Sequence, residues 1–286
     1  MPRVVVTGGS GKLGRACVKD LVGHGYEVLN IDLNPPREPI SAYSKIDLTD
    51  YGQVLEAMVG GINDRLSGPF DGIVHLAAIP APGLTANSAT FTNNTAASYN
   101  VFQAARQAGI RNIVFASSET VLGLPFDMPP PYAPVDEAYP PRPESAYSLG
   151  KVVDETIAAQ YCRWDSELKM IGLRFSNVMY PEDYKAFPGF DANPLIRKWN
   201  LWGYIDARDG AQAIRLALES KLKGLEVFVI ANADTVMKKP SAELMAEVFP
   251  KVKMQRQVNG NETLLSIGKA KKVLGYTPEH SWRKEV

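Results

Sequence analysis

The sequence predicts an α/β fold in which a doubly wound parallel sheet carries helices on both faces and a small C-terminal lobe follows. Short β-branched runs alternate with longer amphipathic stretches, as in successive βαβ units. The first of these runs leads straight into a glycine-rich loop, and the alternation stops near residue 232. At 286 residues, the chain has room for one large α/β domain with an appended lobe.

Each expected element follows from its own local pattern. Apolar β-branched runs predict strands, and the amphipathic stretches between them predict helices. Gly109 provides a stop signal for the third helix, and Asp206 with Asp209 provides a start signal for the fifth. The strands are expected at 3–7, 27–31, 72–76, 111–116, 169–174 and 225–230, and the helices at 12–23, 51–59, 88–108, 145–163, 207–219, 241–248 and 266–274.

Two stretches interrupt this alternation. Residues 122–144 contain eight prolines and predict an extended loop over the carboxyl edge of the sheet, of the kind that forms lids or binding loops. Residues 178–204 are rich in aromatic residues, Pro, Gly and Asn, and predict a second loop-built surface. We therefore expect a sheet domain at 1–177, with 205–232 returning to it, and a small substrate-binding lobe formed by 178–204 and 233–286.

Composition narrows the classes of partner. The chain carries 31 basic and 31 acidic residues, so it lacks the positive charge that binding to nucleic acid or an anionic membrane requires. No apolar run approaches the ~18–20 residues of a membrane span, and the first strand leaves no room for a signal peptide. Cys17 and Cys162 have no metal-ligand spacing. We expect two buried free thiols in a cytoplasmic protein without a metal site.

The glycine-rich loop after the first strand allows two phosphate ligands. An ATP-binding P-loop requires Gly-x-x-x-x-Gly-Lys followed by Ser or Thr, because that hydroxyl binds magnesium. Here Val6 stands in place of the first glycine and Leu13 follows Lys12, so both ends of that motif fail. The spacing of Gly8, Gly11 and Gly14 between a strand and a helix instead predicts a dinucleotide site.

An acidic residue at the end of the second strand supports the dinucleotide interpretation. Asp32 lies 18 residues past Gly14, where a carboxylate binds the adenosine ribose. A carboxylate accepts hydrogen bonds from a ribose 2′-hydroxyl but repels a 2′-phosphate, so NAD is favoured over NADP, although Lys12, Arg15 and Arg37 are nearby cations. The alternative is that Asp32 is only a turn carboxylate. The sheet domain is then expected to be an NAD-binding Rossmann domain.

Tyr147 and Lys151 are four residues apart on an expected helix and share one face. A phenol is a weak acid near neutral pH, and a neighbouring ammonium stabilises its phenolate form. Such a tyrosine can take a proton from an alcohol while hydride leaves for a nicotinamide. The spacing alone is common on helix surfaces, but Ser117 and Ser118 follow the fourth expected strand and bring hydroxyl groups to the same edge of the sheet.

Taken together, the glycine loop, the serine pair and Tyr147-x-x-x-Lys151 resemble the extended short-chain dehydrogenase/reductase superfamily and, within it, the NAD-dependent epimerase/dehydratase family. The resemblance spans residues 3–232. Further matching segments follow in order: Asp47-Leu48, His75-Leu76-Ala77-Ala78, Asn94, "LRFSNVMYP" at 173–181 and "YIDARD" at 204–209.

The resemblance implies a role for each matching residue. Tyr147 would be the catalytic acid/base, Ser118 the catalytic serine, and Lys151 would stabilise the phenolate and hold the nicotinamide ribose. Ser118 and Asn177 would face the substrate, and Glu119 would either contact it or be a solvated loop carboxylate. The expected cofactor-binding residues are Gly8, Ser10, Gly11, Lys12, Leu13, Gly14, Asp32, Asp47, Leu48, Leu76, Ala77, Ala78, Asn94, Ser117, Tyr147, Lys151, Phe175, Asn177 and Val178.

The segment at 178–203 bears on the substrate. Nucleotide-sugar epimerases generally have a longer segment here, whereas this one has 26 residues, with Lys185, Arg197 and Lys198 as its basic residues. A diphosphate favours more positive charge, so we expect a small sugar, sugar acid or similar alcohol. The size also resembles that of uronate dehydrogenases.

Three functions follow from these observations. The first is an NAD-dependent dehydrogenase of a sugar-like secondary alcohol. The alternative is a sugar or nucleotide-sugar epimerase or dehydratase that keeps its NAD bound. A cofactor-sensing regulator is disfavoured, because Ser118, Tyr147 and Lys151 are all present. The resemblance also implies a homodimer formed through the helices at 88–108 and 145–163.

Overall fold

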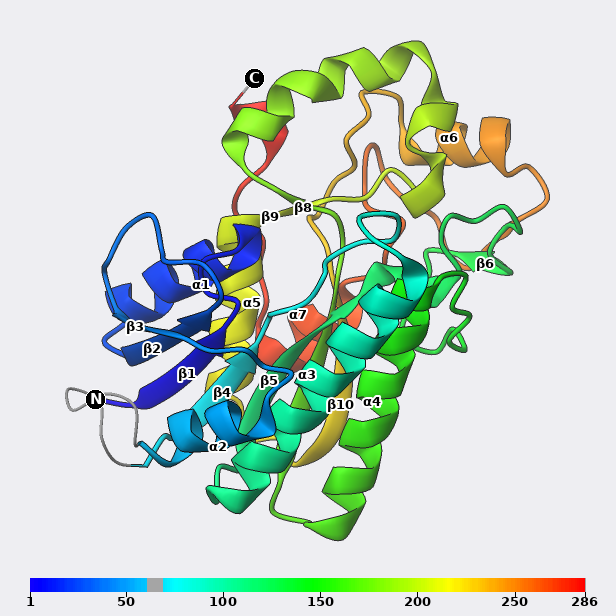
Figure 1. Ribbon diagram of the computed structural model, residues 1–286. Coiled ribbons are helices and arrows are strands. Elements are labelled where there is room, and N and C mark those ends of the chain that lie inside the picture. Colours follow the sequence, from blue (N-terminus) through cyan, green and yellow to red (C-terminus); the bar gives the residue numbers. More distant parts are fainter. Residues whose placement is uncertain (61–68, 286) are drawn as a thin grey trace.

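The computed structural model describes residues 1–60 and 69–285 and confirms the α/β fold (Figure 1). Seven parallel strands form one sheet in the order β10-β7-β5-β4-β1-β2-β3. The order reverses between β1 and β4, so their carboxyl ends border the crevice in which α/β proteins bind ligands. The strands of the sheet are β1 (Arg3–Thr7), β2 (Glu27–Asp32), β3 (Ala42–Lys45), β4 (Gly72–His75), β5 (Asn112–Ser118), β7 (Lys169–Phe175) and β10 (Gly224–Ile230).

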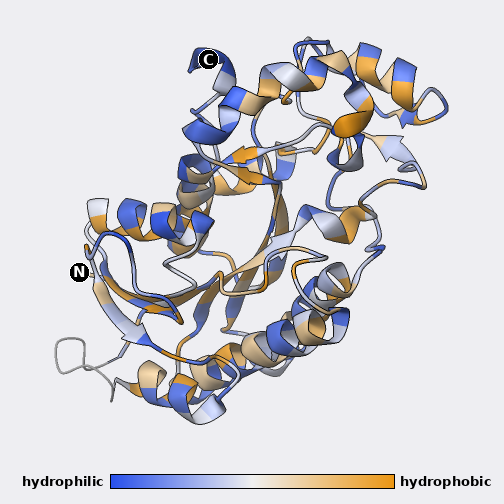
Figure 2. Ribbon diagram, turned by 45° about the horizontal axis from the view of Figure 1, so that its top comes forward, coloured by the Kyte–Doolittle hydropathy of each residue, from blue (hydrophilic) through white to orange (hydrophobic). Residues whose placement is uncertain are grey.

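Helices cover both faces of the sheet because successive strand residues point to opposite sides. On β1, Val4 and Val6 belong to the core cluster that includes α1 and α5, whereas Val5 belongs to the cluster that includes α2, α3 and α4. Figure 2 shows hydrophobic and hydrophilic residues alternating along these helices, as expected of helices with one buried side. The helices are α1 (Lys12–Gly23), α2 (Tyr51–Val59), α3 (Asn87–Gln107), α4 (Ala146–Trp164), α5 (Ala207–Glu219), α6 (Ser241–Val248) and α7 (Gly268–Leu274).

The local patterns predict most element boundaries correctly. The helices expected at 12–23, 51–59, 207–219 and 241–248 coincide with α1, α2, α5 and α6, and the other expected helices and strands end within two residues of the observed ones. Gly109 follows the end of α3 with a φ of 74°, as its stop signal predicts. Strand β3 was missed, because its sequence Ala-Tyr-Ser-Lys contains no β-branched run and it pairs only along the edge of the sheet.

The two stretches that interrupt the alternation contain short elements. The proline-rich stretch contributes β6 (Tyr132–Ala133), which pairs with β11 (Lys253–Met254). Residues 178–204 begin with β8 (Val178–Met179), which pairs with β9 (Ile205–Asp206), and continue as three 3₁₀ helices. The aromatic residues of this stretch pack against the C-terminal residues: Phe187 on Trp282, with ring centroids 5.6 Å apart, and Trp202 on Phe249, at 6.1 Å.

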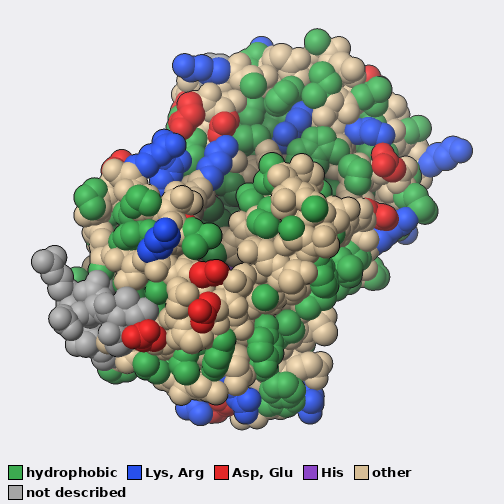
Figure 3. Space-filling model, viewed as in Figure 1, with side chains coloured by type: hydrophobic (Ala, Val, Ile, Leu, Met, Phe, Trp, Pro, Cys, Tyr) green, Lys and Arg blue, Asp and Glu red, His purple; other side chains and the backbone are tan. Residues whose placement is uncertain are grey.

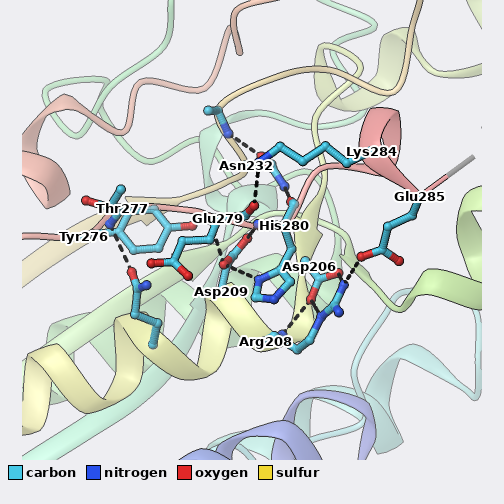
Figure 4. Close-up of polar contacts among 12 residues, drawn as sticks. Asp206, Arg208, Asp209, Asn232, Tyr276, Thr277, Glu279, His280, Lys284 and Glu285 are labelled. Carbon is cyan, nitrogen blue, oxygen red and sulfur yellow. Dashed lines mark hydrogen bonds and ion pairs between the residues drawn. The ribbon is translucent and has the colours of Figure 1, made fainter.

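The start of α5 holds the C-terminal segment in place (Figure 4). Asp206 caps the helix as expected, accepting a hydrogen bond from the backbone N–H of Arg208 at 2.8 Å. Asp209, which the sequence pairs with Asp206 as a helix start signal, does not take part in capping the helix. Its buried carboxylate instead accepts hydrogen bonds from the backbone N–H groups of Glu279 (2.9 Å) and His280 (3.0 Å) and contacts His280 Nδ1 at 2.8 Å. The "YIDARD" segment therefore attaches the end of the described chain to the sheet domain.

Both cysteines are free thiols on helices. Cys17 is buried in α1, as expected, but Cys162 in α4 is only half-buried, which corrects the expectation of two buried thiols. Within residues 1–60 and 69–285, no helix combines the length and the apolar character that a membrane crossing requires.

Candidate active site

The glycine loop between β1 and α1 is shaped by close backbone approaches. Gly8 has a φ of +72°, and a Cβ atom there would lie 2.6 Å from the backbone nitrogen of Ala77. A Cβ atom on Gly14 would lie 2.0 Å from the carbonyl oxygen of Gly8. Both positions therefore require glycine. The loop brings its backbone N–H groups and the N-terminus of α1 to the crevice, an arrangement that binds the pyrophosphate of a dinucleotide.

Asp32 ends β2 beside this loop. One carboxylate oxygen accepts a hydrogen bond from the backbone N–H of Ser10 at 3.1 Å, and the other accepts one from that of Asn34 at 2.9 Å. These bonds fix the carboxylate at the edge of the crevice, where a ribose hydroxyl can reach it. This is the position from which the sequence predicts that Asp32 binds the adenosine ribose of NAD.

One cavity of about 1030 Å³ runs along the carboxyl edge of the sheet. Figure 3 shows this face of the molecule hollowed near its centre, with both positively and negatively charged side chains around the hollow. Its lining residues include all but one of the predicted site residues: Gly8, Ser10, Gly11, Lys12, Leu13, Gly14, Asp32, Asp47, Leu48, Leu76, Ala77, Ala78, Ser117, Ser118, Glu119, Tyr147, Lys151, Phe175, Asn177 and Val178. The proline-rich loop also reaches the cavity, through Leu124 and Pro125.

Asn94 is the predicted site residue that does not line the cavity. Its side-chain oxygen accepts a hydrogen bond from the backbone N–H of Ile79 at 2.8 Å, and its side-chain nitrogen donates one to the carbonyl of Ile79 at 3.0 Å. Ile79 itself lines the cavity. Asn94 therefore positions the chain after β4.

Ser118, Tyr147 and Lys151 meet at the cavity from two elements. Ser118 ends β5, and Tyr147 and Lys151 lie in the first two turns of α4, which begins with the capping box of Ser145 and Ser148. Lys151 Nζ donates a hydrogen bond to the carbonyl of Ala116 at 2.8 Å and lies 6.0 Å from the centre of the Tyr147 ring.

The Ser118 hydroxyl is oriented by Thr120. Ser118 Oγ accepts hydrogen bonds from the backbone N–H of Thr120 at 3.1 Å and from its hydroxyl at 3.0 Å. Since both bonds use Oγ as the acceptor, the Ser118 proton is available to a ligand in the cavity.

Ser117 is engaged away from the cavity, although it contributes to the lining. Its hydroxyl donates a hydrogen bond of 2.6 Å to Glu155, which in turn accepts two bonds from Arg174, at 2.9 Å and 2.8 Å. This buried ion pair ties α4 to β7 beneath the site. Lys12, at the other end of the cavity, forms an ion pair of 2.6 Å with Asp183.

Glu119 is not a solvated loop carboxylate, because only 3% of it is exposed. One carboxylate oxygen accepts a hydrogen bond from Asn200 at 3.1 Å, and the other, Oε2, has no hydrogen-bond partner. Burial raises the pKa of Glu119 to about 7, while the neighbouring polar groups of Ser176 and Asn200 and the charge of Arg197 oppose this rise.

The structure also brings Ser176, Arg197 and Asn200 to this part of the site, and sequence reasoning missed all three as a group. Ser176 Oγ, Arg197 Nε and Asn200 Oδ1 are buried and have no hydrogen-bond partner. Ser176 lies within the matching segment at 173–181, where only its neighbour Asn177 was assigned to the substrate, and Arg197 and Asn200 lie in an irregular segment with no signal for their position. Of the three, Ser176 lines the cavity, whereas Arg197 and Asn200 are buried and do not line it.

Comparison with known proteins gives the same assignment as the site. The family model described as "NAD dependent epimerase/dehydratase family" matches residues 4–231. The UDP-glucose 4-epimerase of Corynebacterium glutamicum is 27% identical over 98% of this chain and 92% of its own length. The L-arabinose 1-dehydrogenase (NAD(P)(+)) of Haloferax volcanii is 27% identical over 78% of this chain and 84% of its own length.

A solved structure of a UDP-galactose 4-epimerase superposes with a TM-score of 0.71 at 28% identity, covering 99% of this chain and 95% of that one. The glycine loop and Asp32 fit the cofactor of this family, NAD. The chain belongs to the NAD-dependent epimerase/dehydratase family and is an NAD-dependent enzyme.

Proposed function

We propose that the chain transfers hydride between NAD and a secondary carbon of a sugar substrate, with Tyr147 as the proton acceptor and donor. The observation that carries this proposal is that Ser118, Tyr147 and Lys151 line the same cavity as the glycine loop and Asp32. NAD, when bound, accepts the hydride and can return it. Proton transfer and orientation of the substrate fall to the protein.

Each of the three residues has a distinct task. The Ser118 hydroxyl accepts two hydrogen bonds from Thr120 and donates none to it, so its proton can be donated in a hydrogen bond to the substrate oxygen. Tyr147 takes the proton of the substrate hydroxyl as the carbonyl forms, and returns it in the reverse direction. Lys151 is held by the carbonyl of Ala116, and its positive charge favours the phenolate form of the tyrosine.

The comparisons favour the NAD-retaining epimerase, which sequence analysis gave as the alternative, over net dehydrogenation. The UDP-glucose 4-epimerase of C. glutamicum matches almost the whole chain, and the UDP-galactose 4-epimerase structure matches it at similar identity. We therefore propose epimerisation of a sugar or nucleotide sugar as the first function, in which the hydride returns to the same carbon from the other side.

Net oxidation of a free sugar is the second candidate, because the cavity has little positive charge for a substrate diphosphate. In the part of the chain that the structure describes, the only cations lining the cavity are Lys12 and Lys151. Both are already paired, with Asp183 and Asp154 respectively. The L-arabinose 1-dehydrogenase among the relatives is consistent with this candidate.

We propose that residues 178–204 and 233–286 form the substrate-binding lobe. Val178 and Trp199 line the cavity from the first of these segments, and Phe187 and Trp202 attach that segment to the second. Ser176, Asn177 and Glu119 lie where this lobe meets the end of the sheet.

The test uses the purified full chain. First, nucleotide released by denaturing the protein is identified, since a retained cofactor supports epimerisation. The protein is then incubated with UDP-sugars and free sugars, with and without added NAD. Formation of the epimer without net growth of reduced-nicotinamide absorbance indicates epimerisation, and steady growth indicates net oxidation.

Tyr147→Phe tests the proposed chemistry itself. The variant is expected to lose turnover by at least about 100-fold, the lower range for removal of a general acid/base, while its NAD affinity changes little. Asn94→Ala, a change outside the cavity, serves to show how a positioning defect behaves. Wild-type turnover in Tyr147→Phe would refute the assignment.

We also propose a homodimer formed through α3 and α4. Tyr99 on α3 and Leu149 on α4 are 49% and 45% exposed, so this pair of packed helices offers large apolar side chains to a second copy. Sedimentation equilibrium would show a dimer in the wild type and a shift toward monomer in Tyr99→Glu; a monomeric wild type would rule the proposal out.

A further inference from the structure

Helix α4 carries a third ionisable residue in line with Tyr147 and Lys151. Asp154 lies three residues after Lys151 and seven after Tyr147, so all three share one face of the helix. Lys151 Nζ is 3.4 Å from Asp154 Oδ2, and the two side chains are only 4% and 1% exposed. Along the helix, Lys151 thus lies between Tyr147, the proposed proton-transfer residue, and the carboxylate of Asp154.

A buried polar chain supports Asp154 from behind. Burial raises the pKa of the Asp154 carboxyl, and the charge of Lys151 and the hydroxyl of Ser98 on α3 oppose this rise. Ser98 Oγ is hydrogen-bonded to His75 Nε2 at 3.1 Å, and His75 Nδ1 to Thr7 Oγ1 at 2.7 Å. Burial, together with the Lys151 charge, lowers the pKa of His75 to about 3, so this ring adds no charge.

The other charges around Lys151 are compensated elsewhere. Glu155, the next residue of α4, is bound by both Arg174 and Ser117. From β5, the residue that contacts Lys151 Nζ is Ala116, through its carbonyl. Among the described residues, Asp154 is the only carboxylate within ion-pair distance of Lys151, and Lys151 is the only cation within that distance of Asp154.

We propose that Asp154 is a positioning residue that offsets the charge of Lys151 and thereby raises the pH at which Tyr147 becomes an effective base. This rests on the proposed function, because it assumes that Lys151 acts on Tyr147. An ammonium that faces a carboxylate on one side exerts a weaker field on a phenol on the other. Asp154 would therefore set the working pH of the enzyme without touching the substrate.

The helix geometry gives the size of the effect. Seven residues of α-helix rise about 10 Å, and with an effective dielectric constant of about 25–50 a unit charge at that distance shifts a titration by about 0.5–1 pH unit. The sign follows from the charge: removing a negative charge makes the tyrosine easier to deprotonate. The acid side of the activity profile should therefore move to lower pH.

Asp154→Asn tests this inference, because it removes the charge and keeps the shape. The pH dependence of kcat/KM is measured for the variant and the wild type, and the acid limb is expected to lie about 0.5–1 pH unit lower in the variant. Asp165→Asn is the matched control: it makes the same change at the end of α4, where Asp165 pairs with Arg111, and should leave the limb in place.

A second readout does not depend on turnover. The ultraviolet difference absorbance of phenolate, titrated in wild type, Asp154→Asn and the corresponding Tyr147→Phe forms, should show the Tyr147 signal appearing at lower pH when Asp154 is neutral. An unmoved limb together with a lower unfolding temperature would show that Asp154 is only structural and would overturn the inference. A shift to higher pH would also overturn it, because the carboxylate would then act by keeping Lys151 charged.

Ser98→Ala covers the case in which Asp154→Asn does not fold. Without the Ser98 hydroxyl, the Asp154 carboxylate is less well stabilised, so a smaller shift in the same direction is expected, and no shift counts against the inference. The two proposals fail separately. Full activity in Tyr147→Phe refutes the proposed function, whereas an unmoved profile in Asp154→Asn refutes only the role of Asp154.

Discussion

The buried carboxyl of Glu119 allows a prediction in which stability depends on pH. The structure places it beside Ser118, with one oxygen bound to Asn200 and the other without a hydrogen-bond partner. Burial raises its pKa from 4.5 to about 7. Between these two values the folded chain keeps the proton of Glu119 and the unfolded chain has lost it.

The size and sign of the effect follow from this difference in proton binding. When the folded state binds more protons, stability falls as pH rises. The contribution of Glu119 is therefore fully present below about pH 4.5 and is lost by about pH 7, and the shift corresponds to about 3 kcal/mol. Glutamine stays neutral at every pH, so Glu119→Gln should remove this loss.

Local contacts should support the amide. The glutamine oxygen can keep the bond from Asn200, and its NH₂ group can donate toward Ser176 Oγ, which lacks a partner. We expect Glu119→Gln to unfold with a free energy up to about 3 kcal/mol above that of the wild type at about pH 8, and close to it at about pH 5.

Urea unfolding followed by tryptophan fluorescence, at both pH values and at one fixed NAD concentration, measures this difference. Glu56→Gln is the control, because Glu56 is exposed on α2. A stability difference that is the same at both pH values, or a less stable Glu119→Gln variant at about pH 8, would refute the reasoning. Since Glu119 lines the cavity, the more stable variant is also expected to lose activity, as is common where a strained site serves function.

Two further substitutions test the cofactor site and the fold. Asp32→Ala should raise the KM for NAD about 10-fold or more and narrow the preference for NAD over NADP, because it removes a charged acceptor from the ribose position. Initial rates with both cofactors measure this, and an unchanged preference would contradict the predicted role of Asp32. Lys169→Met should lower the free energy of unfolding by about 1–3 kcal/mol, because Lys169 Nζ donates hydrogen bonds to the carbonyls of Ala217, Leu218 and Ser220 at the end of α5. Urea denaturation measures this change, and an unaltered midpoint would show that these bonds contribute nothing.

The cofactor side of the site could be predicted because its residues follow a rule of the fold. The carboxyl ends of parallel strands share one edge of the sheet, so the glycine loop, Asp32, Ser118 and Asn177 had to converge once their strands were recognised. Tyr147 and Lys151 were predicted from their helical spacing together with the serine pair that ends the neighbouring strand. Local sequence signals placed these residues on their strands and helix, and the roles predicted for Ser118 and Asn177 came from the family resemblance.

The substrate side depends on contacts that no local pattern specifies. Asn200 reaches Glu119 only because the chain after it turns through Leu201 and Trp202, which adopt φ angles of 53° and 58° that non-glycine residues rarely take. Asn94 matched a family motif, yet its amide is used by the backbone of Ile79. In both cases the role is set by tertiary contacts, so sequence reasoning could name the residue or its neighbourhood but not its partner.

Retention of NAD separates the two candidate functions. Surface contacts of the glycine loop are one feature that could slow the release of NAD. Tyr180 donates a hydrogen bond to the carbonyl of Lys12 at 2.9 Å, and Lys12 pairs with Asp183 at 2.6 Å. The side chains of this ion pair are 44% and 32% exposed, and pairs of this kind contribute at most about 1 kcal/mol. They are too weak to hold a dinucleotide by themselves, so slow release would have to come from contacts deeper in the cavity, around the buried Lys151. The amount of NAD that copurifies with the chain therefore reports on the cavity and not on this surface contact.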